Sequence, residues 1–147
     1  MNALDVTTEI IISAPRQKTA EWASNPDFAP EWYANIHFAQ WKTSRPLAVG
    51  SQFLFEAHFL GKKLRYTYEV VEFIPEQKLS MRTADGPFPM ETTYTWESLD
   101  SQTTRMILRN RGNPAGFSRL FRPFMAFAVK KANQKDLKQL KYLLENS

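Results

Sequence analysis

The chain has 147 residues, of which 43% are hydrophobic, and it combines a formal net charge of +4 with two histidines and no cysteine. This length predicts a single domain over residues 1–147, and no apolar run approaches the ~20 residues that span a bilayer. The composition excludes disulfides, thiol nucleophiles, thiolate metal ligands and a histidine-rich metal site.

The N-terminal segment predicts a strand followed by two short helices. It lacks a basic stretch leading into an apolar one, so we expect no secretory signal and a cytoplasmic location. Residues Leu4–Ser13 alternate between apolar and polar, which is typical of a strand with one buried face. Pro15 suits the first turn of a helix over Arg16–Ser24, and Asp27 can cap a second helix that ends at Trp32 or Tyr33.

From Ile36 onward the pattern has period two for about seventy residues, which predicts an antiparallel meander. Short turn segments that contain Gly, Pro, Asp or Ser separate the strands. The predicted strands are Ile36–Thr43, Gln52–Leu60, Leu64–Ile74, Lys78–Ala84, Glu91–Leu99 and Thr103–Arg111. A one-residue bulge near Val70-Val71 would reverse the faces of the residues that follow it.

The last third of the chain, Gly116 to Asn146, predicts one long helix with an interruption at Pro123. Its apolar residues fall on two stripes at helical spacing, Phe117, Leu120, Phe121, Phe124 and Ala128 on one, and Val129, Leu137, Leu140 and Leu144 on the other. The first half of this helix must therefore be covered on more than one side. The cover could be a sheet, a ligand-filled cavity, a second subunit or a membrane. The order of elements predicts an α+β domain with the long helix on one face of a curved antiparallel sheet.

Charge is distributed unevenly along the chain. Residues 101–147 carry ten Lys and Arg against two Asp and Glu, or +8, whereas residues 1–100 carry nine against thirteen, or −4. A basic end can draw a protein to anionic lipid, nucleic acid or an acidic ligand, and it also fits a solvated helix face. Aromatic residues do not interleave with basic ones as they do on RNA-binding surfaces, so we expect no nucleic-acid partner.

Several elements in this order resemble the SRPBCC superfamily. They are Ser13-Ala14-Pro15, Trp22, Pro26, Trp32, Val49–Phe53, Tyr68–Pro75 with Leu79, Thr104-Arg105, Gly112, and Asp136–Lys141 with Glu145. The superfamily includes START domains, birch-pollen-type proteins and bacterial polyketide cyclase/dehydrase-like proteins, which are the most similar group. The resemblance implies a helix-grip fold of about seven strands. It also implies a cavity between the long helix and the sheet that holds an apolar small molecule such as a lipid, sterol or polyketide.

Alternation along the strands predicts which side chains would line such a cavity. The candidate ligand-binding residues are Phe53, Phe55, Tyr66, Tyr68, Arg82, Tyr94, Trp96, Met106, Phe121, Phe124 and Ala128. The tyrosines and Arg82 form the best candidate polar set inside the cavity. In the alternative interpretation the tyrosines are core residues with hydroxyls at the sheet rim, and Arg82 is exposed.

No established catalytic motif is present. The sequence has two histidines, His37 and His58, but no Gly-x-Ser-x-Gly nucleophile motif, so a hydrolase triad is not expected. The glycines form no phosphate-binding loop, which argues against nucleotide hydrolysis. The alternation of the strands places most of their carboxylates on the outer face, away from a common metal site. We therefore expect no metal and no cofactor. Three hypotheses remain: a protein that binds a small apolar or amphipathic ligand, a cyclase/aromatase-type enzyme using the same cavity, and a protein- or membrane-interaction module using the basic helix. Each is compatible with a monomer or a homodimer.

Overall fold

The computed structural model describes residues 4–59, 61–113 and 122–147. Its elements are β1 (Leu4–Ile12), α1 (Arg16–Ser24), the 3-10 turn η1 (Pro26–Phe28), α2 (Ala29–Trp32), β2 (Ile36–Trp41), β3 (Gln52–Phe59), β4 (Lys62–Ile74), β5 (Lys78–Asp85), β6 (Met90–Asp100), β7 (Thr103–Gly112) and α3 (Arg122–Glu145). The predicted strands and the first helix are confirmed, and their ends differ from the prediction by at most two residues.

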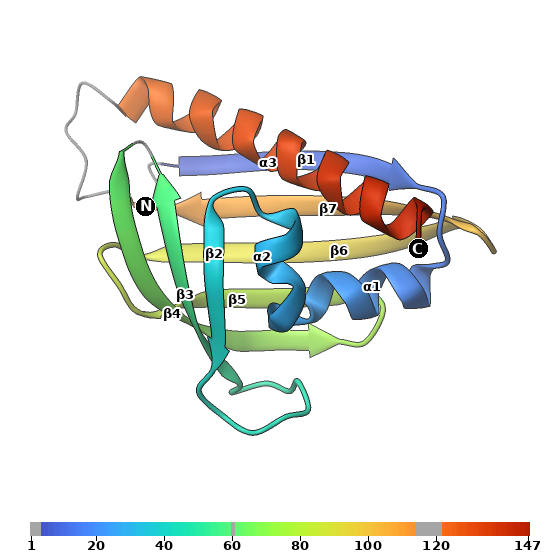
Figure 1. Cartoon of the computed structure of the whole chain (residues 1–147), viewed down its shortest axis with the longest axis horizontal. Coiled ribbons are helices and arrows are strands. Elements are labelled where there is room, and N and C mark those ends of the chain that lie inside the picture. Colours follow the sequence, from blue (N-terminus) through green and yellow to red (C-terminus); the bar gives the residue numbers. More distant parts are fainter. Residues whose placement is uncertain (1–3, 60, 114–121) are drawn as a thin grey trace.

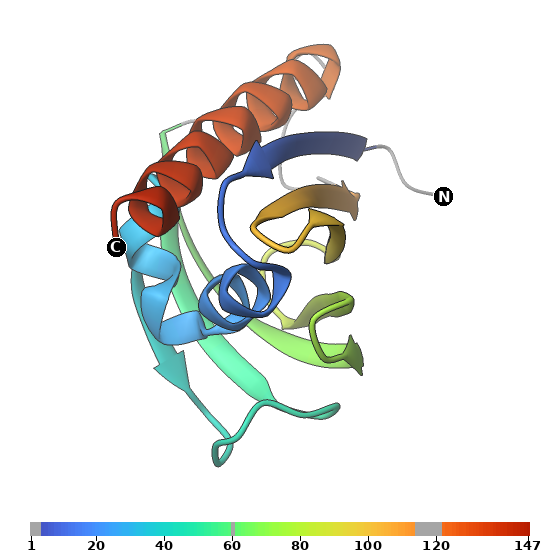
Figure 2. The same cartoon turned by 90° about the vertical axis from the view of Figure 1, so that its right-hand side faces the viewer.

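All seven strands form one antiparallel sheet in the order β1-β7-β6-β5-β4-β3-β2. The sheet curls strongly, and α3 lies across its open, concave side, with α1 and α2 on the same side (Figures 1 and 2). In β4 the pairing with β5 shifts between Val70 and Glu72, which leaves Val71 as the extra residue of a bulge. Val70 is fully buried before the bulge and Phe73 turns toward the core after it. The bulge thus lies at the predicted position, Val70-Val71, where the alternation of apolar and polar residues did not show which side chains face inward.

The second helical segment begins differently from the prediction. The side chain of Asn25, not Asp27, caps it, because Asn25 Oδ1 accepts a hydrogen bond from the Asp27 backbone N–H at 3.0 Å. The Asp27 carboxylate instead pairs with the Arg45 guanidinium at 2.6 Å. The segment runs through one 3-10 turn into the single turn of α2, whose Trp32 is buried.

Helix α3 buries the second of the two predicted stripes. Val129, Leu137, Leu140 and Leu144 are all buried, together with Met125. The prediction for the first stripe was wrong at Phe124, whose side chain is 68% exposed. Because Met125 faces the sheet, the preceding residue is turned about 100° away from it. The described part of α3 includes Pro123 as its second residue. The predicted start at Gly116, the helix before Pro123, and Phe117, Leu120 and Phe121 lie outside the described residues.

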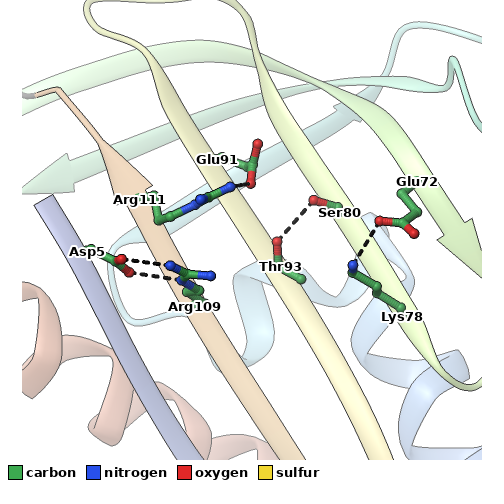
Figure 3. Close-up of polar contacts among 8 residues, drawn as sticks. All are labelled: Asp5, Glu72, Lys78, Ser80, Glu91, Thr93, Arg109 and Arg111. Carbon is green, nitrogen blue, oxygen red and sulfur yellow. Dashed lines mark hydrogen bonds and ion pairs between the residues drawn. The ribbon is translucent and has the colours of Figure 1, made fainter. Parts of the chain in front are cut away.

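The convex face of the sheet carries cross-strand ion pairs, several of which are drawn in Figure 3. Arg109 on β7 donates two hydrogen bonds to Asp5 on β1, at 2.9 and 2.7 Å. Arg111 pairs with Glu91 on β6, and Lys78 on β5 pairs with Glu72 on β4 at 2.9 Å. Basic residues of the last strand are therefore partnered by acidic residues from the first hundred positions. The charge asymmetry of the sequence is partly neutralised on this face.

Candidate functional site

A cavity of about 150 Å³ lies between α3 and the concave face of the sheet. Side chains from β1, from β3 to β7, from the α1–β2 segment and from α3 line it. The wall is mostly apolar, and the rings of Phe55, Tyr66 and Tyr68 pack together with centroids 5.1 to 5.9 Å apart. On α3 the lining runs from Met125 to Asp136, which is about 16 Å along a helix axis. The cavity is thus long enough to have two different ends.

One end of the cavity is apolar. Leu4 and Met125 are buried there in one cluster, with Phe88 and Met90 packed against it. Gly112 permits this packing, because a Cβ at this position would lie 2.7 Å from the carbonyl oxygen of Pro89. A larger residue at Gly112 would push the β5–β6 loop and Met90 away from the cavity.

Polar groups on the sheet form a hydrogen-bonded chain within the cavity wall. The Tyr68 hydroxyl bonds to Thr92 Oγ1 at 2.8 Å, and Thr92 Oγ1 donates to Asn110 Oδ1 at 2.6 Å. Burial raises the pKa of Tyr68 to about 12. Burial also raises the pKa of Tyr66 well above its usual value, and no described residue hydrogen-bonds its hydroxyl. Both phenols therefore stay neutral at physiological pH.

The other end of the cavity is polar, and we call Tyr33, Tyr94, Asn133 and Asp136 the polar end. The hydroxyls of Tyr33 and Tyr94 hydrogen-bond to each other, and burial raises the pKa of both phenols. Asp136 is 2% exposed and its Oδ1 accepts a hydrogen bond from the Ala34 backbone N–H at 3.0 Å. Burial raises the pKa of this carboxyl to about 6, although the Ala34 N–H and the positive charge of Lys135 act in the opposite direction.

Asn133 is the second polar residue that α3 contributes to this end. It lies one helical turn before Asp136, so both side chains share the face that looks toward the sheet. Asn133 is 5% exposed, and its Nδ2 has no hydrogen-bond partner among the residues that the structure describes. A buried amide donor without a partner is uncommon and calls for an explanation.

The structure places five of the predicted site residues on the cavity wall, namely Phe53, Phe55, Tyr66, Tyr68 and Tyr94. Trp96 and Met106, which pair across β6 and β7, belong to the solid core with Leu137 and Leu140 instead. Ala128 is half-buried beside the lining residue Val129 but is not itself part of the lining. Phe121 lies outside the described residues.

Two other predicted lining residues face solvent. Arg82 is exposed because its neighbour Met81 occupies the inward position of β5, and its register partners are Glu69 and Glu91 on the convex face. Phe124 projects from the outer face of α3, where Phe127 is also 69% exposed. Neither Arg82 nor Phe124 can contact a ligand in the cavity as the structure stands.

Sequence reasoning missed the polar end almost entirely, since of its residues only Tyr94 was a candidate. A signal was present in α3, because Asn133 and Asp136 continue the spacing of the buried residues Val129, Leu137 and Leu140. Polar residues at such positions must be satisfied inside the protein or by a ligand. Tyr33 carried no comparable signal, because it follows a helix of one turn.

In the described part of the chain, no three His, Cys, Asp or Glu side chains gather as metal ligands. The rings of His37 and His58 lie 4.4 Å apart on the exposed surface of β2 and β3. The helices in this part of the chain include none with the length and apolar character needed to cross a membrane.

Solved structures with the same architecture identify the fold as helix-grip. A START superfamily protein from Mycobacterium smegmatis superposes with a TM-score of 0.82 at 14% identity, covering 97% of both chains. A Thermus thermophilus protein superposes with a TM-score of 0.82 at 18% identity, also over 97% of both chains. The Zhui aromatase/cyclase from a Streptomyces species gives 0.79 at 13% identity, over 96% of this chain and 93% of that chain. At these identities the likeness establishes the fold alone.

The family follows from the sequence match. The family model described as polyketide cyclase / dehydrase and lipid transport matches residues 3–145, and the chain belongs to this family. No curated protein sequence matches the chain significantly. The resemblance to START-like and polyketide cyclase-like proteins is thus confirmed.

Proposed function

We propose that the protein binds a small apolar or amphipathic molecule, of lipid or polyketide type, in the cavity between α3 and the sheet. One observation carries this proposal: the cavity between α3 and the sheet is mostly apolar, and at one end it is lined by polar residues that include Asn133, whose buried Nδ2 has no partner among the described residues. Burial of the ligand's apolar area would supply affinity, and the polar end would fix its orientation. The family's description, which includes lipid transport, is consistent with this role.

A matched pair of alanines on α3 tests the proposal. Ala132 lines the cavity, whereas Ala126 is exposed on the same helix. The neutral fluorescent probe N-phenyl-1-naphthylamine should bind the wild-type protein with increased emission. Ala132→Leu should weaken binding at least tenfold by filling the cavity, and Ala126→Leu should leave it unchanged. Equal binding to both variants would place the probe outside the cavity and refute the proposal.

A second candidate is a cyclase/aromatase-type enzyme that uses the same cavity. It is favoured by Asp136, because a buried carboxyl with a pKa of about 6 can accept a proton near neutral pH. A soluble poly-β-ketone offered as substrate should then give an aromatic product, detected by its absorbance. Asp136→Asn should abolish turnover without abolishing substrate binding. Identical product formation with and without the protein would exclude this activity for that substrate.

The outer face of α3 supports a third role, contact with an anionic membrane. Phe124 and Phe127 are exposed beside Lys130 and Lys131, which form no ion pair with any residue in the described ranges. Aromatic and basic side chains together favour the interface of anionic bilayers. Sedimentation with vesicles of phosphatidylglycerol and phosphatidylcholine should then pull down the protein at low salt and release it at high salt. Absence from the pellet at low salt would exclude this role.

A further inference from the structure

The polar end of the cavity contains a donor and an acceptor whose hydrogen-bonding capacity is not filled by the part of the chain that the structure describes. Asn133 Nδ2 is buried, and no residue in the described ranges is its hydrogen-bond partner. The Asp136 carboxylate accepts the Ala34 N–H at Oδ1, and no other described side chain or backbone group donates to it. Both residues line the cavity and lie one turn apart on α3. A ligand that satisfies them must therefore present an acceptor to the amide and a donor to the carboxylate.

The charges around this end disfavour an anionic ligand. Among the described residues that line the cavity, Asp136 has the only acidic side chain, and none of these residues is Lys, Arg or His. Lys135 is the nearest basic neighbour in the sequence, but it is exposed on the outer side of α3. Arg109 and Arg111 of β7 lie on the opposite face of the sheet, where they pair with Asp5 and Glu91 (Figure 3). A buried carboxylate head group would thus meet the like charge of Asp136, and the exposed Lys135 would offset that charge only in part.

The amide of Asn133 distinguishes between the head groups that remain. An ammonium group could neutralise Asp136, but it has no acceptor for Asn133 Nδ2–H. An ether or ester has acceptors but no donor for the carboxylate. A hydroxyl or enol has both in one atom. The hydroxyls of Tyr33 and Tyr94, already bonded to each other, show that phenol-like groups fit this environment.

We propose that the polar end selects ligands that end in a neutral hydroxyl or enol and rejects those that end in a carboxylate. This inference rests on the proposed function. The ligand's apolar body would lie toward Met125 and Met90, and its oxygen would lie between Asn133 and Asp136. Free fatty acids would then be poor ligands, whereas phenols, enolised β-ketones and long-chain or ring alcohols would be good ones. This assigns Asn133 and Asp136 as specificity-determining residues.

Four probes with the same two-ring body test this selection. They are 2-naphthol, naphthalene, 2-naphthoate and 2-naphthylmethylammonium, whose dissociation constants would be measured by calorimetry or by displacement of the fluorescent probe at neutral pH. We expect 2-naphthol to bind at least tenfold more tightly than each of the others. In Asn133→Leu, 2-naphthol should no longer bind more tightly than naphthalene, and naphthalene itself should still bind. The exposed Gln134→Leu on the same helix should change neither ratio.

Asp136→Asn provides an independent readout, because the amide oxygen can still accept the Ala34 N–H. Removing the charge should improve 2-naphthoate binding at least tenfold relative to the wild type. If 2-naphthol and naphthalene bind equally, or if 2-naphthoate or the ammonium probe binds best, the selection is refuted while cavity binding stands. If no probe binds and none displaces another, the proposed function itself fails. If a variant does not fold, the comparison of the four probes on the wild-type protein still decides the question.

Discussion

Replacing Asp136 by Asn should change how the stability of the protein depends on pH. The carboxyl is 2% exposed and packed near Tyr33, from the segment after α2, and Tyr94, from β6. Both phenols are neutral, and the nearby Lys135 only partly offsets the burial. Asparagine has the same shape and keeps an acceptor for the Ala34 N–H. The substitution therefore removes the charge with little change in packing.

The magnitude follows from the raised pKa. Burial raises the pKa of Asp136 from its usual value of 3.8 to about 6, so the folded state holds this proton more tightly than the unfolded state does. The contribution to stability is then most favourable below pH 3.8 and is lost as pH rises to about 6. A difference of roughly two pH units corresponds to about 3 kcal/mol. Relative to the wild type, the variant should thus gain about 3 kcal/mol in free energy of unfolding between acidic and neutral pH.

Urea unfolding of both proteins from pH 3.5 to 7.5 measures this difference, with the exposed Asp85→Asn as the control. The difference between Asp136→Asn and the wild type should grow across the interval from pH 3.8 to 6 and stay constant above it. The control should follow the wild type. Parallel curves for Asp136→Asn and the wild type throughout this range would show that the carboxyl is not held in an environment that penalises its charge.

Three further predictions concern packing and the tyrosines. Gly112→Ala should destabilise the protein by about 1–3 kcal/mol in urea unfolding, because its Cβ would lie 2.7 Å from the Pro89 carbonyl oxygen; an unchanged midpoint would contradict this. Phe124→Ala should alter stability by less than about 0.5 kcal/mol, whereas the buried Phe53→Ala should cost about 3–5 kcal/mol; similar losses would refute the assigned burial. Absorbance titration of the folded protein should show the Tyr68 phenol neutral at pH 10, since its pKa is raised to about 12; ionisation near pH 10 would contradict its burial.

The strands were predictable because their signals are local. Alternation and turn residues located all seven strands, and on β3 and β6 the inward aromatics Phe53, Phe55 and Tyr94 were assigned correctly. Such positions depend only on the two-residue period of a strand. Arg82 shows the limit of this reasoning, because its face depends on register with the neighbouring strands rather than on its own composition.

The polar end was not predictable in the same way, because it forms only when distant segments meet. Tyr33 and Tyr94 are 61 positions apart in the sequence, and Ala34 and Asp136 are 102 apart. Phe124 illustrates the opposite error. An apolar ring at helical spacing predicts burial, but the start of α3 buries Met125 and Val129 and leaves Phe124 and Phe127 exposed. Periodicity identifies an apolar stripe without showing where its cover ends.

Native mass spectrometry of the protein purified from its own host would show whether the cavity between α3 and the sheet carries a ligand. We expect one small molecule per chain, released on denaturation, apolar over most of its structure and ending in a neutral oxygen group. The Ala132→Leu variant should lose this molecule and Ala126→Leu should retain it. An empty wild-type protein that also gains no thermal stability from a panel of lipids, phenols and polyketides would contradict the claim that the cavity binds a ligand.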